Sequence, residues 1–326
     1  MLRSVLAQTY TDFELLVVDD DSTDGTHDLV QSFADPRLRL HHNARRYGLP
    51  GNWNRCLELA CGDYVCIFHQ DDLMLPENLA HKVQALDADP DVILAHSAAE
   101  VLVSPDAPAP LPSWDGPADE VLDGPACLRK LVLEGNFICC PSVVARRLSL
   151  LEVGGFYEQL GFACDYDAWM RLAALGRVAF LCQPLVCYRW HGTNASHAFA
   201  QGRAYEEVAT ACRRALEHYA ARTGRREEAA SLAAALAVLA DCRQQVRTLQ
   251  SWVAELEKVK AWFLDRIEDQ KQTISSQEQR LAECREALAE GQRVRDALLA
   301  SKTWKVGSLL LAPCRALRRA ASTSTC

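Results

Sequence analysis

The sequence has no long apolar run, no paired Cys-x-x-Cys motif and no excess of positive charge. No stretch stays apolar over the roughly 18 residues that a membrane-spanning helix needs. The 14 cysteines are scattered without paired spacing, which argues against a zinc site. The formal net charge of −8 argues against general binding of nucleic acid.

The composition is that of an ordinary globular protein, with 49% hydrophobic and 24% charged residues. A length of 326 residues is enough for two domains of typical size. Several cysteines lie inside apolar runs, so we expect buried, reduced thiols in a cytoplasmic protein. No secretory signal is recognisable, which agrees with that location.

The chain is organised around the stretch from Gly62 to Pro76. Its apolar run Tyr64 to Phe68 predicts a buried strand, and Pro76 opens a helical pattern that continues to Leu86. Between them lie Asp71 and Asp72, two carboxylates that repel each other unless a cation lies between them. Acids at the carboxyl end of a central strand occupy the place where open α/β sheets bind ligands. A loop opening without a ligand remains the alternative.

Strands and helices alternate along the first 200 residues, which predicts an α/β fold with a mostly parallel sheet flanked by helices. The expected strands are Glu14–Val18, Leu38–Leu40, Tyr64–Phe68, Val92–Val103, Val178–Leu181 and Val186–Arg189, with a further extended segment at Phe137–Ala145. Helical patterns separate them, among them one that Asp123 caps and one that runs from Asp165 to Leu175.

An ordered set of motifs occupies this region: Gln8-Thr9-Tyr10, Val18-Asp19-Asp20-Asp21-Ser22-Thr23-Asp24-Gly25-Thr26, Gly62-Asp63-Tyr64, His69-Gln70-Asp71-Asp72, Gly154-Gly155-Phe156, Asp165-Tyr166-Asp167-Ala168-Trp169-Met170-Arg171-Leu172 and Tyr188-Arg189-Trp190-His191. In order and spacing the set resembles family 2 glycosyltransferases of the bacterial surface-polysaccharide type. The resemblance covers about residues 1–200 and implies an inverting enzyme with the GT-A fold.

The resemblance fails at the start of the chain. Similar domains open with a strand that ends in Pro-x-Tyr-Asn or a like sequence, whereas Met1 here falls inside the first helix. That strand lies in the middle of the family's sheet, so its loss leaves backbone groups unpaired. We expect a start site upstream of Met1; a poorly folded, inactive remnant is the alternative.

The resemblance also implies roles for the strand-end acids. It places a Mg²⁺ or Mn²⁺ ion on Asp72 and sugar or ribose contacts on Asp71. Asp19 and Asp20 would contact the nucleotide, with Asp20 facing a pyrimidine base such as uracil or thymine. The alternative is that the acids from Asp19 to Asp24 only turn the chain and cap the next helix.

A further carboxylate, Asp165, opens a helix near the expected cleft and is the candidate base that deprotonates the acceptor hydroxyl. Capping of its own helix is the alternative role. By resemblance the segment from Arg189 to His191 closes over the diphosphate. His191 is then a candidate metal ligand and Arg189 a candidate phosphate partner, although a lone histidine after a strand is more often a solvated loop residue.

The carboxyl-terminal third has a different character, because alanine, glutamate, arginine, glutamine and leucine dominate from about Arg203. A heptad pattern begins at Val246 and predicts a coiled coil through which the chain forms homo-oligomers. One set of core positions is Val246, Val253, Lys260, Ile267, Ile274, Leu281, Leu288 and Arg295; the other is Leu249, Leu256, Phe263, Gln270, Gln277, Cys284, Gly291 and Leu298. Packing of this helix on its own domain is the alternative.

These patterns predict four segments. Residues 1–200 form the transferase domain, 201–240 a helical connector, 241–300 the coiled coil and 301–326 a basic amphipathic tail. The tail combines lysines and arginines with apolar residues, as segments that lie on anionic membranes do. A frayed basic terminus is the alternative.

The expected function is metal-dependent transfer of a sugar from a UDP- or dTDP-sugar to a polysaccharide or lipid-linked acceptor. It would take place in the cytoplasm, with peripheral contact to the inner membrane through the tail. A non-catalytic coiled-coil scaffold with an inert transferase domain is the competing hypothesis. A nucleotidyltransferase is a weaker one, because no glycine-rich, basic phosphate loop is visible near the start.

Overall fold

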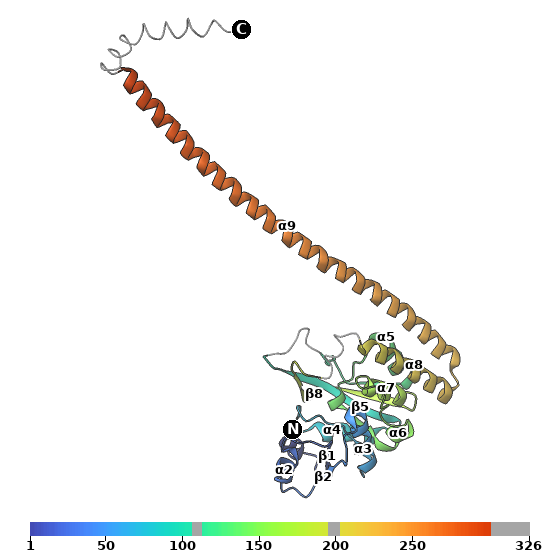
Figure 1. The fold of residues 1–326 in the computed structure, drawn as a ribbon. Helices are drawn as coiled ribbons and strands as arrows, with labels where there is room; N and C mark the ends of the chain where they lie inside the picture. Colours follow the sequence, from blue (N-terminus) through green and yellow to red (C-terminus); the bar gives the residue numbers. More distant parts are fainter. Residues whose placement is uncertain (106–112, 195–202, 301–326) are drawn as a thin grey trace. The chain divides into compact units, whose positions relative to one another are not determined.

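A computed structural model describes residues 1–105, 113–194 and 203–300. The chain divides into two compact units, Met1–Cys242 and Arg243–Cys326. The elements, which Figure 1 labels where there is room, are α1 (Leu2–Leu6), β1 (Leu15–Asp19), α2 (Thr26–Gln31), β2 (Leu38–His42), α3 (Gly48–Leu59), β3 (Tyr64–Val65), β4 (Leu73–Met74), α4 (Asn78–Ala88), β5 (Val92–Val103), β6 (Glu120–Leu122), α5 (Gly124–Glu134), η1 (Cys140–Ser142), β7 (Val144–Arg146), α6 (Arg147–Glu152), α7 (Cys164–Leu172), β8 (Arg177–Trp190), α8 (Arg203–Thr223) and α9 (Arg226–Ala300).

The first unit is built on two sheets. The larger has the strand order β3-β7-β5-β8-β4, with β6 paired to β8, and the smaller consists of β1 and β2. The longest ladders, β5–β8 and β1–β2, are parallel as expected, while the short ladders are antiparallel. The first seven residues of β5 are buried, which explains why this strand is apolar without alternation.

Helices α5, α7 and α8 share one hydrophobic core with β5 and β8. Trp169 of α7 and Tyr219 of α8 are among its largest buried side chains. The side chain of Asp123 accepts a hydrogen bond from the N–H of Ala126 and caps α5, as the sequence predicts. The next residue, Gly124, lies so close to the carbonyl oxygen of Ala173 that a Cβ atom there would be 2.0 Å from it.

Several expected strands differ in length from the observed ones. The run Tyr64–Phe68 is a strand only at Tyr64–Val65. The expected strands 178–181 and 186–189 are one strand, β8, whose register against β5 shifts between Leu181 and Pro184. The sequence pattern at a bulge next to a proline predicts the end of a strand, although the strand continues beyond it.

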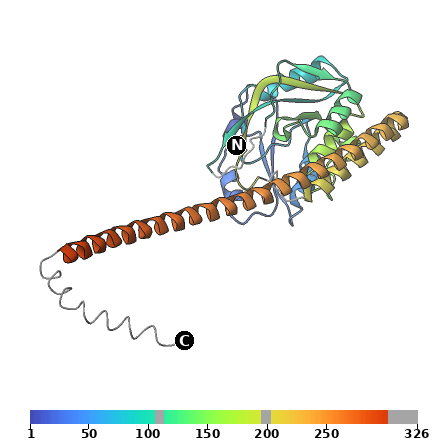
Figure 2. The same cartoon turned by 90° about the horizontal axis from the view of Figure 1, so that it is seen from above.

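Helix α8 and the first turns of α9 belong to the first unit, where Ala211, Cys212, Leu216, Ala229 and Leu232 are buried. The second unit contains the rest of α9, which Figure 2 shows as one unbroken helix through residue 300. Its apolar side chains, among them Val246, Leu249, Val253 and Leu256, are exposed. None of the described helices combines the length and the apolar character that a membrane span needs. The expected basic tail, residues 301–326, lies outside the described residues.

Candidate active site

The acid pair Asp71–Asp72 precedes β4, and antiparallel pairing of β4 with β8 brings it to Arg189. One carboxylate oxygen of Asp72, Oδ1, accepts the backbone N–H of Arg189 at 2.7 Å. The guanidinium Nε of Arg189 donates to the carbonyl oxygen of Asp71 at 3.0 Å. Asp72 is fully buried, and its second oxygen, Oδ2, has no hydrogen-bond partner among the described residues.

Two histidines flank the acid pair. The Nε2 atom of His191 lies 3.0 Å from Oδ2 of Asp71. On the other side, Nδ1 of His69 lies 3.5 Å from Oδ2 of Asp72, and its ring stacks on Trp53 with ring centroids 5.4 Å apart. His69, Asp71 and Asp72 each offer one ligand atom, and these atoms lie within 4.8 Å of one another. A buried carboxylate oxygen without a partner fits a bound cation, because such groups are otherwise satisfied in proteins.

Asp165 lies in the first turn of α7, as its place in the sequence predicts. Its carboxylate accepts hydrogen bonds from the backbone N–H of Tyr166 at 2.6 Å and from Nδ2 of Asn136 at 3.4 Å. Burial raises the pKa of Asp165 to about 6, although these hydrogen bonds and the nearby His69 act in the opposite direction. A carboxylate with a pKa near neutrality is suited to accept a proton.

The other acid of this helix, Asp167, is buried in an ion-pair network. Its Oδ2 atom accepts hydrogen bonds from Nε and Nη2 of Arg171 at 2.9 and 2.5 Å, and its Oδ1 atom accepts one from Arg214 at 3.3 Å. Arg171 also donates to the carbonyl oxygens of Val153 and Gly155. The buried Asp167–Arg171 pair balances its two charges and fixes α7, the helix that carries Asp165.

The acids at the end of β1 are held by their surroundings. Asp20 accepts hydrogen bonds from the backbone N–H groups of Tyr47 at 2.8 Å and Gly48 at 2.9 Å. Asp19 accepts from Ser22 at 3.2 Å and pairs with Nδ1 of His42 at 2.9 Å. Burial alone would raise the pKa of Asp19, but its hydrogen bonds to Ser22 and His42 outweigh burial and lower it.

Helix α3 connects the two groups of acids. The side chain of Asn52 donates to the carbonyl oxygen of Val18, just before Asp19, while the next residue, Trp53, stacks on His69. The structure therefore gathers Asp71, Asp72, Arg189 and His191 around one point, with His69 beside Asp165. The chemical roles expected for these residues remain predictions.

Sequence reasoning did not single out His69 as a site residue. Its position two residues before Asp71 was the available signal, but its stacking partner lies on another element and is not visible from spacing.

Known proteins resemble this chain in sequence and in fold. Residues 1–115 match the glycosyl transferase family 2 domain. An uncharacterised protein of Mycobacterium tuberculosis is 34% identical over 194 residues, which are 55% of this chain and 59% of that protein. The UDP-Glc:alpha-D-GlcNAc-diphosphoundecaprenol beta-1,3-glucosyltransferase WfgD of Escherichia coli is 36% identical over 85 residues, 26% of this chain and 34% of that enzyme. The chain thus spans less than two thirds of the length of either relative.

Among solved structures, the crystal structure of S. aureus TarS 1-349 in complex with UDP-GlcNAc is similar, with a TM-score of 0.58 and 18% identity. The match covers 72% of this chain and 66% of that one. It confirms the expected GT-A-like α/β fold. The domain match and the named relatives also support the expected enzyme class, a glycosyltransferase.

Proposed function

Starting from the glycosyl transferase family 2 domain in residues 1–115, we propose that this chain is an inverting, metal-dependent glycosyltransferase. It moves a sugar from a UDP- or dTDP-sugar to a polysaccharide or lipid-linked acceptor. The E. coli relative, by its name, uses UDP-Glc and a diphosphoundecaprenol-linked acceptor, which supports this choice of donor and acceptor class.

The observation that carries the proposal is the buried Oδ2 oxygen of Asp72, which has no hydrogen-bond partner in the described part of the chain and lies beside Asp71 and 3.5 Å from Nδ1 of His69. Carboxylate oxygens are the ligands that Mg²⁺ and Mn²⁺ prefer, and Asp72 is the residue that would hold the ion. When bound, the ion supplies neutralising charge for the leaving diphosphate. In this proposal His191 supports Asp71 or joins the ion, and Arg189 pairs with a phosphate oxygen.

Asp165 acts in this proposal as the general base. One of its carboxylate oxygens takes the proton of the acceptor hydroxyl while the hydroxyl oxygen attacks the anomeric carbon and the nucleoside diphosphate leaves. A pKa of about 6 makes Asp165 mostly ionised at neutral pH and still basic enough to accept the proton. The Asp167–Arg171 pair keeps α7, and with it Asp165, in place.

The nucleotide contacts are assigned to Asp20 and Asp71. Asp20 is held against the start of α3 by Tyr47 and Gly48, so its orientation is fixed before any ligand binds. Asp19 adds to that orientation from the end of the same strand through its pair with His42.

The proposal is tested by incubating the full chain with a panel of nucleotide sugars and Mn²⁺. We expect donor cleavage or transfer with a UDP- or dTDP-sugar and its loss on adding EDTA. The variant Asp72→Asn should be inactive, and Asp12→Asn, which alters an exposed acid, should match the wild type. Absence of activity with every donor favours the non-catalytic scaffold.

A further inference from the structure

A second cluster of candidate metal ligands lies at the smaller sheet, apart from the acid pair Asp71–Asp72. It consists of Asp19 at the end of β1, His42 at the end of β2 and His27 in the first turn of α2. Each of the three offers one ligand atom, and these atoms lie within 4.8 Å of one another. The cluster contains no cysteine, so the absence of Cys-x-x-Cys motifs does not bear on it.

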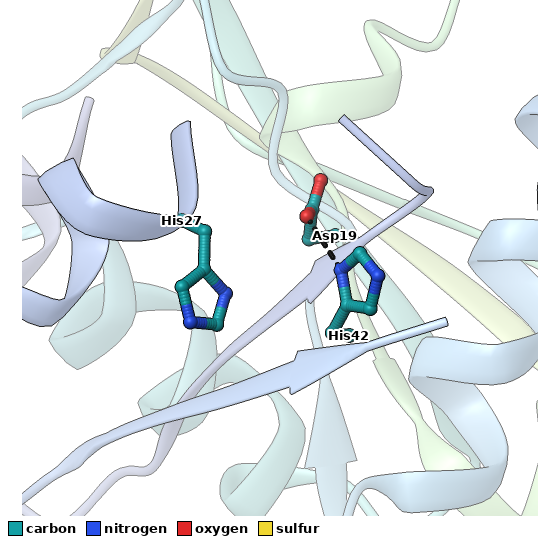
Figure 3. A group of neighbouring side chains, drawn as sticks. All are labelled: Asp19, His27 and His42. Atoms are coloured by element: carbon teal, nitrogen blue, oxygen red, sulfur yellow. Dashed lines mark hydrogen bonds and ion pairs between the residues drawn. The ribbon is translucent and has the colours of Figure 1, made fainter. Parts of the chain in front are cut away.

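The geometry of the cluster is close to that of a metal site. Nδ1 of His42 lies 2.9 Å from Oδ2 of Asp19. The ring of His27 is edge-on to that of His42, with centroids 6.1 Å apart, and Figure 3 shows it beside the Asp19–His42 pair. In a tetrahedral zinc site with bonds of about 2.0–2.1 Å, neighbouring ligand atoms are roughly 3.3 Å apart. The Asp19–His42 pair therefore needs to open only slightly, and the His27 ring needs to turn inward.

The surroundings favour a cation with open access. Asp19 is 4% exposed, so its carboxylate is shielded from water, whereas 46% of the His42 side chain is exposed. Asp21, which has a positive φ of 64°, adds a second carboxylate oxygen 3.8 Å from Nε2 of His42. An ion can thus reach the cluster from solvent and meet net negative charge there.

The donor set selects the kind of ion. Two imidazole nitrogens and one carboxylate suit Zn²⁺ and related transition metals, whereas Mg²⁺ and Ca²⁺ prefer oxygen ligands only. We propose that Asp19, His27 and His42 bind one Zn²⁺ ion, with water as the fourth ligand, and that the ion clamps β1, β2 and α2 together. This inference does not depend on the proposed sugar transfer.

The consequence of the clamp is local. The smaller sheet consists of two strands, and an isolated pair of strands is marginally stable. A metal that joins both strand ends to the following helix holds the turn that carries Asp20. Binding should therefore raise the melting temperature of the protein, in proportion to the logarithm of free Zn²⁺ once the site is filled.

The test uses the full chain with Co²⁺ as a spectroscopic substitute for Zn²⁺. The background is Asp72→Asn, which removes the other cluster, with exposed thiols such as Cys61 alkylated. We expect the visible absorption of a tetrahedral Co²⁺ complex at one equivalent, bleached by one equivalent of Zn²⁺. His27→Gln and His42→Gln should each weaken binding at least about tenfold, which is the lower end of the loss measured when a supporting residue near a metal is removed.

The matched control is His41→Gln. His41 is the neighbour of His42 on β2, and its side chain points to the opposite face of the strand. It should bind Co²⁺ as the background does. Melting temperatures without metal show whether each variant is folded. No stoichiometric Co²⁺ complex in the background, or equal loss in His41→Gln and His42→Gln, overturns the assignment. Because His27 is on the surface of a short helix, His27→Gln alone keeps the test decisive if His42→Gln unfolds.

Discussion

The carboxylate of Asp165 has opposite effects on stability and on the proposed chemistry. Burial raises its pKa to about 6 in the folded chain, from an ordinary value of 3.8. The unfolded chain therefore loses this proton at lower pH than the folded chain does, and stability falls as the pH rises from about 4 to about 6.

Replacing this acid should stabilise the fold. At pH 8, we expect Asp165→Asn to unfold with a free energy roughly 1–3 kcal/mol higher than the wild type, after allowing for the partial exposure of the group. At pH 3 the two proteins should have equal free energies of unfolding, because Asp165 is then protonated and uncharged in both the folded and the unfolded chain. Urea unfolding at the two pH values measures this; an equal gain at both would mean that ionisation is not the cause.

A second buried ionisable group, Lys82 of α4, is not part of the site. It is fully buried, donates to Asn78, and burial lowers its pKa to about 7, against the smaller influence of Cys66 and Cys139. The unfolded chain holds this proton up to about pH 10, so stability should fall as the pH drops from about 10 to 7.

The variant Lys82→Met keeps the length of the side chain and removes the amine. We expect it to raise the free energy of unfolding at pH 7 by up to roughly 5 kcal/mol, the pKa difference converted at about 1.36 kcal/mol per unit. The gain should shrink toward pH 10. Lys258→Met, at an exposed position of α9, is the control and should change stability by less than about 0.5 kcal/mol.

At the scale of elements, α5 approaches the end of α7 so closely at Gly124 that no side chain fits between them. A Cβ atom on Gly124 would lie 2.0 Å from the carbonyl oxygen of Ala173 and 2.8 Å from that of Gly176. Both obstacles are backbone atoms, so α5 would have to move away from the helix that carries Asp165.

We therefore expect Gly124→Ala to lower the free energy of unfolding by roughly 2–4 kcal/mol. This loss equals or exceeds the one usually seen when a larger side chain is introduced into a packed core. Gly291→Ala is the matched control, because nothing lies within 4 Å of a Cβ atom there. Alanine is the better helix former by about 1 kcal/mol, so this change should leave the first unit unaffected and raise the helicity of α9. Equal melting temperatures for the two variants would contradict the close contact.

Local patterns predicted the elements well where burial and capping agree. Strand β5 was expected at Val92–Val103 and has those bounds, because its apolar run ends in turn-forming residues. Helix α5 begins after Asp123 because the side chain of Asp123 caps it, as predicted. The continuity of β8 through Pro184 was not predictable, since it depends on its pairing with β5.

The same limit applies to the site. The sequence predicts Asp165 at the start of a helix, where α7 has it. It predicts Asp71 and Asp72 at the end of a central strand, whereas they lie between β3 and β4, which are at the two ends of the strand order of the larger sheet. The pairing of Asp19 with His42, and the stacking of His69 on Trp53, join residues from different elements. No spacing within one segment encodes such contacts, so sequence reasoning could not find them.

At the scale of the whole molecule, the exposed apolar seam of α9 predicts pairing with a second copy. Leu249, Leu256 and Phe263 are exposed and occupy the same heptad position. Two cysteines share that position: Cys284, and Cys242, which lies seven residues before Leu249. In a parallel coiled coil without stagger, equivalent core residues lie opposite each other. Each cysteine then faces its own copy at a distance that a disulfide can bridge.

Mild oxidation should therefore give a covalent dimer that disappears in the Cys242→Ser, Cys284→Ser double variant. Light scattering should give twice the mass of 36.2 kDa for both proteins, because the seam and not the disulfide holds the dimer. A mass of one chain at tens of micromolar protein, or the absence of any covalent dimer that depends on Cys242 or Cys284, contradicts parallel pairing.

The proposed sugar transfer depends on Asp165 as the base and on Asp72 as the residue that would hold the metal ion. Its most direct test is the rate of transfer by the full chain as a function of pH, measured for the wild type, Asp165→Asn and the control Asp12→Asn. We expect the wild-type rate to rise through a pKa of about 6 to a plateau, with an unchanged profile for Asp12→Asn. The rate of Asp165→Asn should be at least about 100-fold lower and should lack that rise. Wild-type turnover by Asp165→Asn, with the same pH profile, would contradict it.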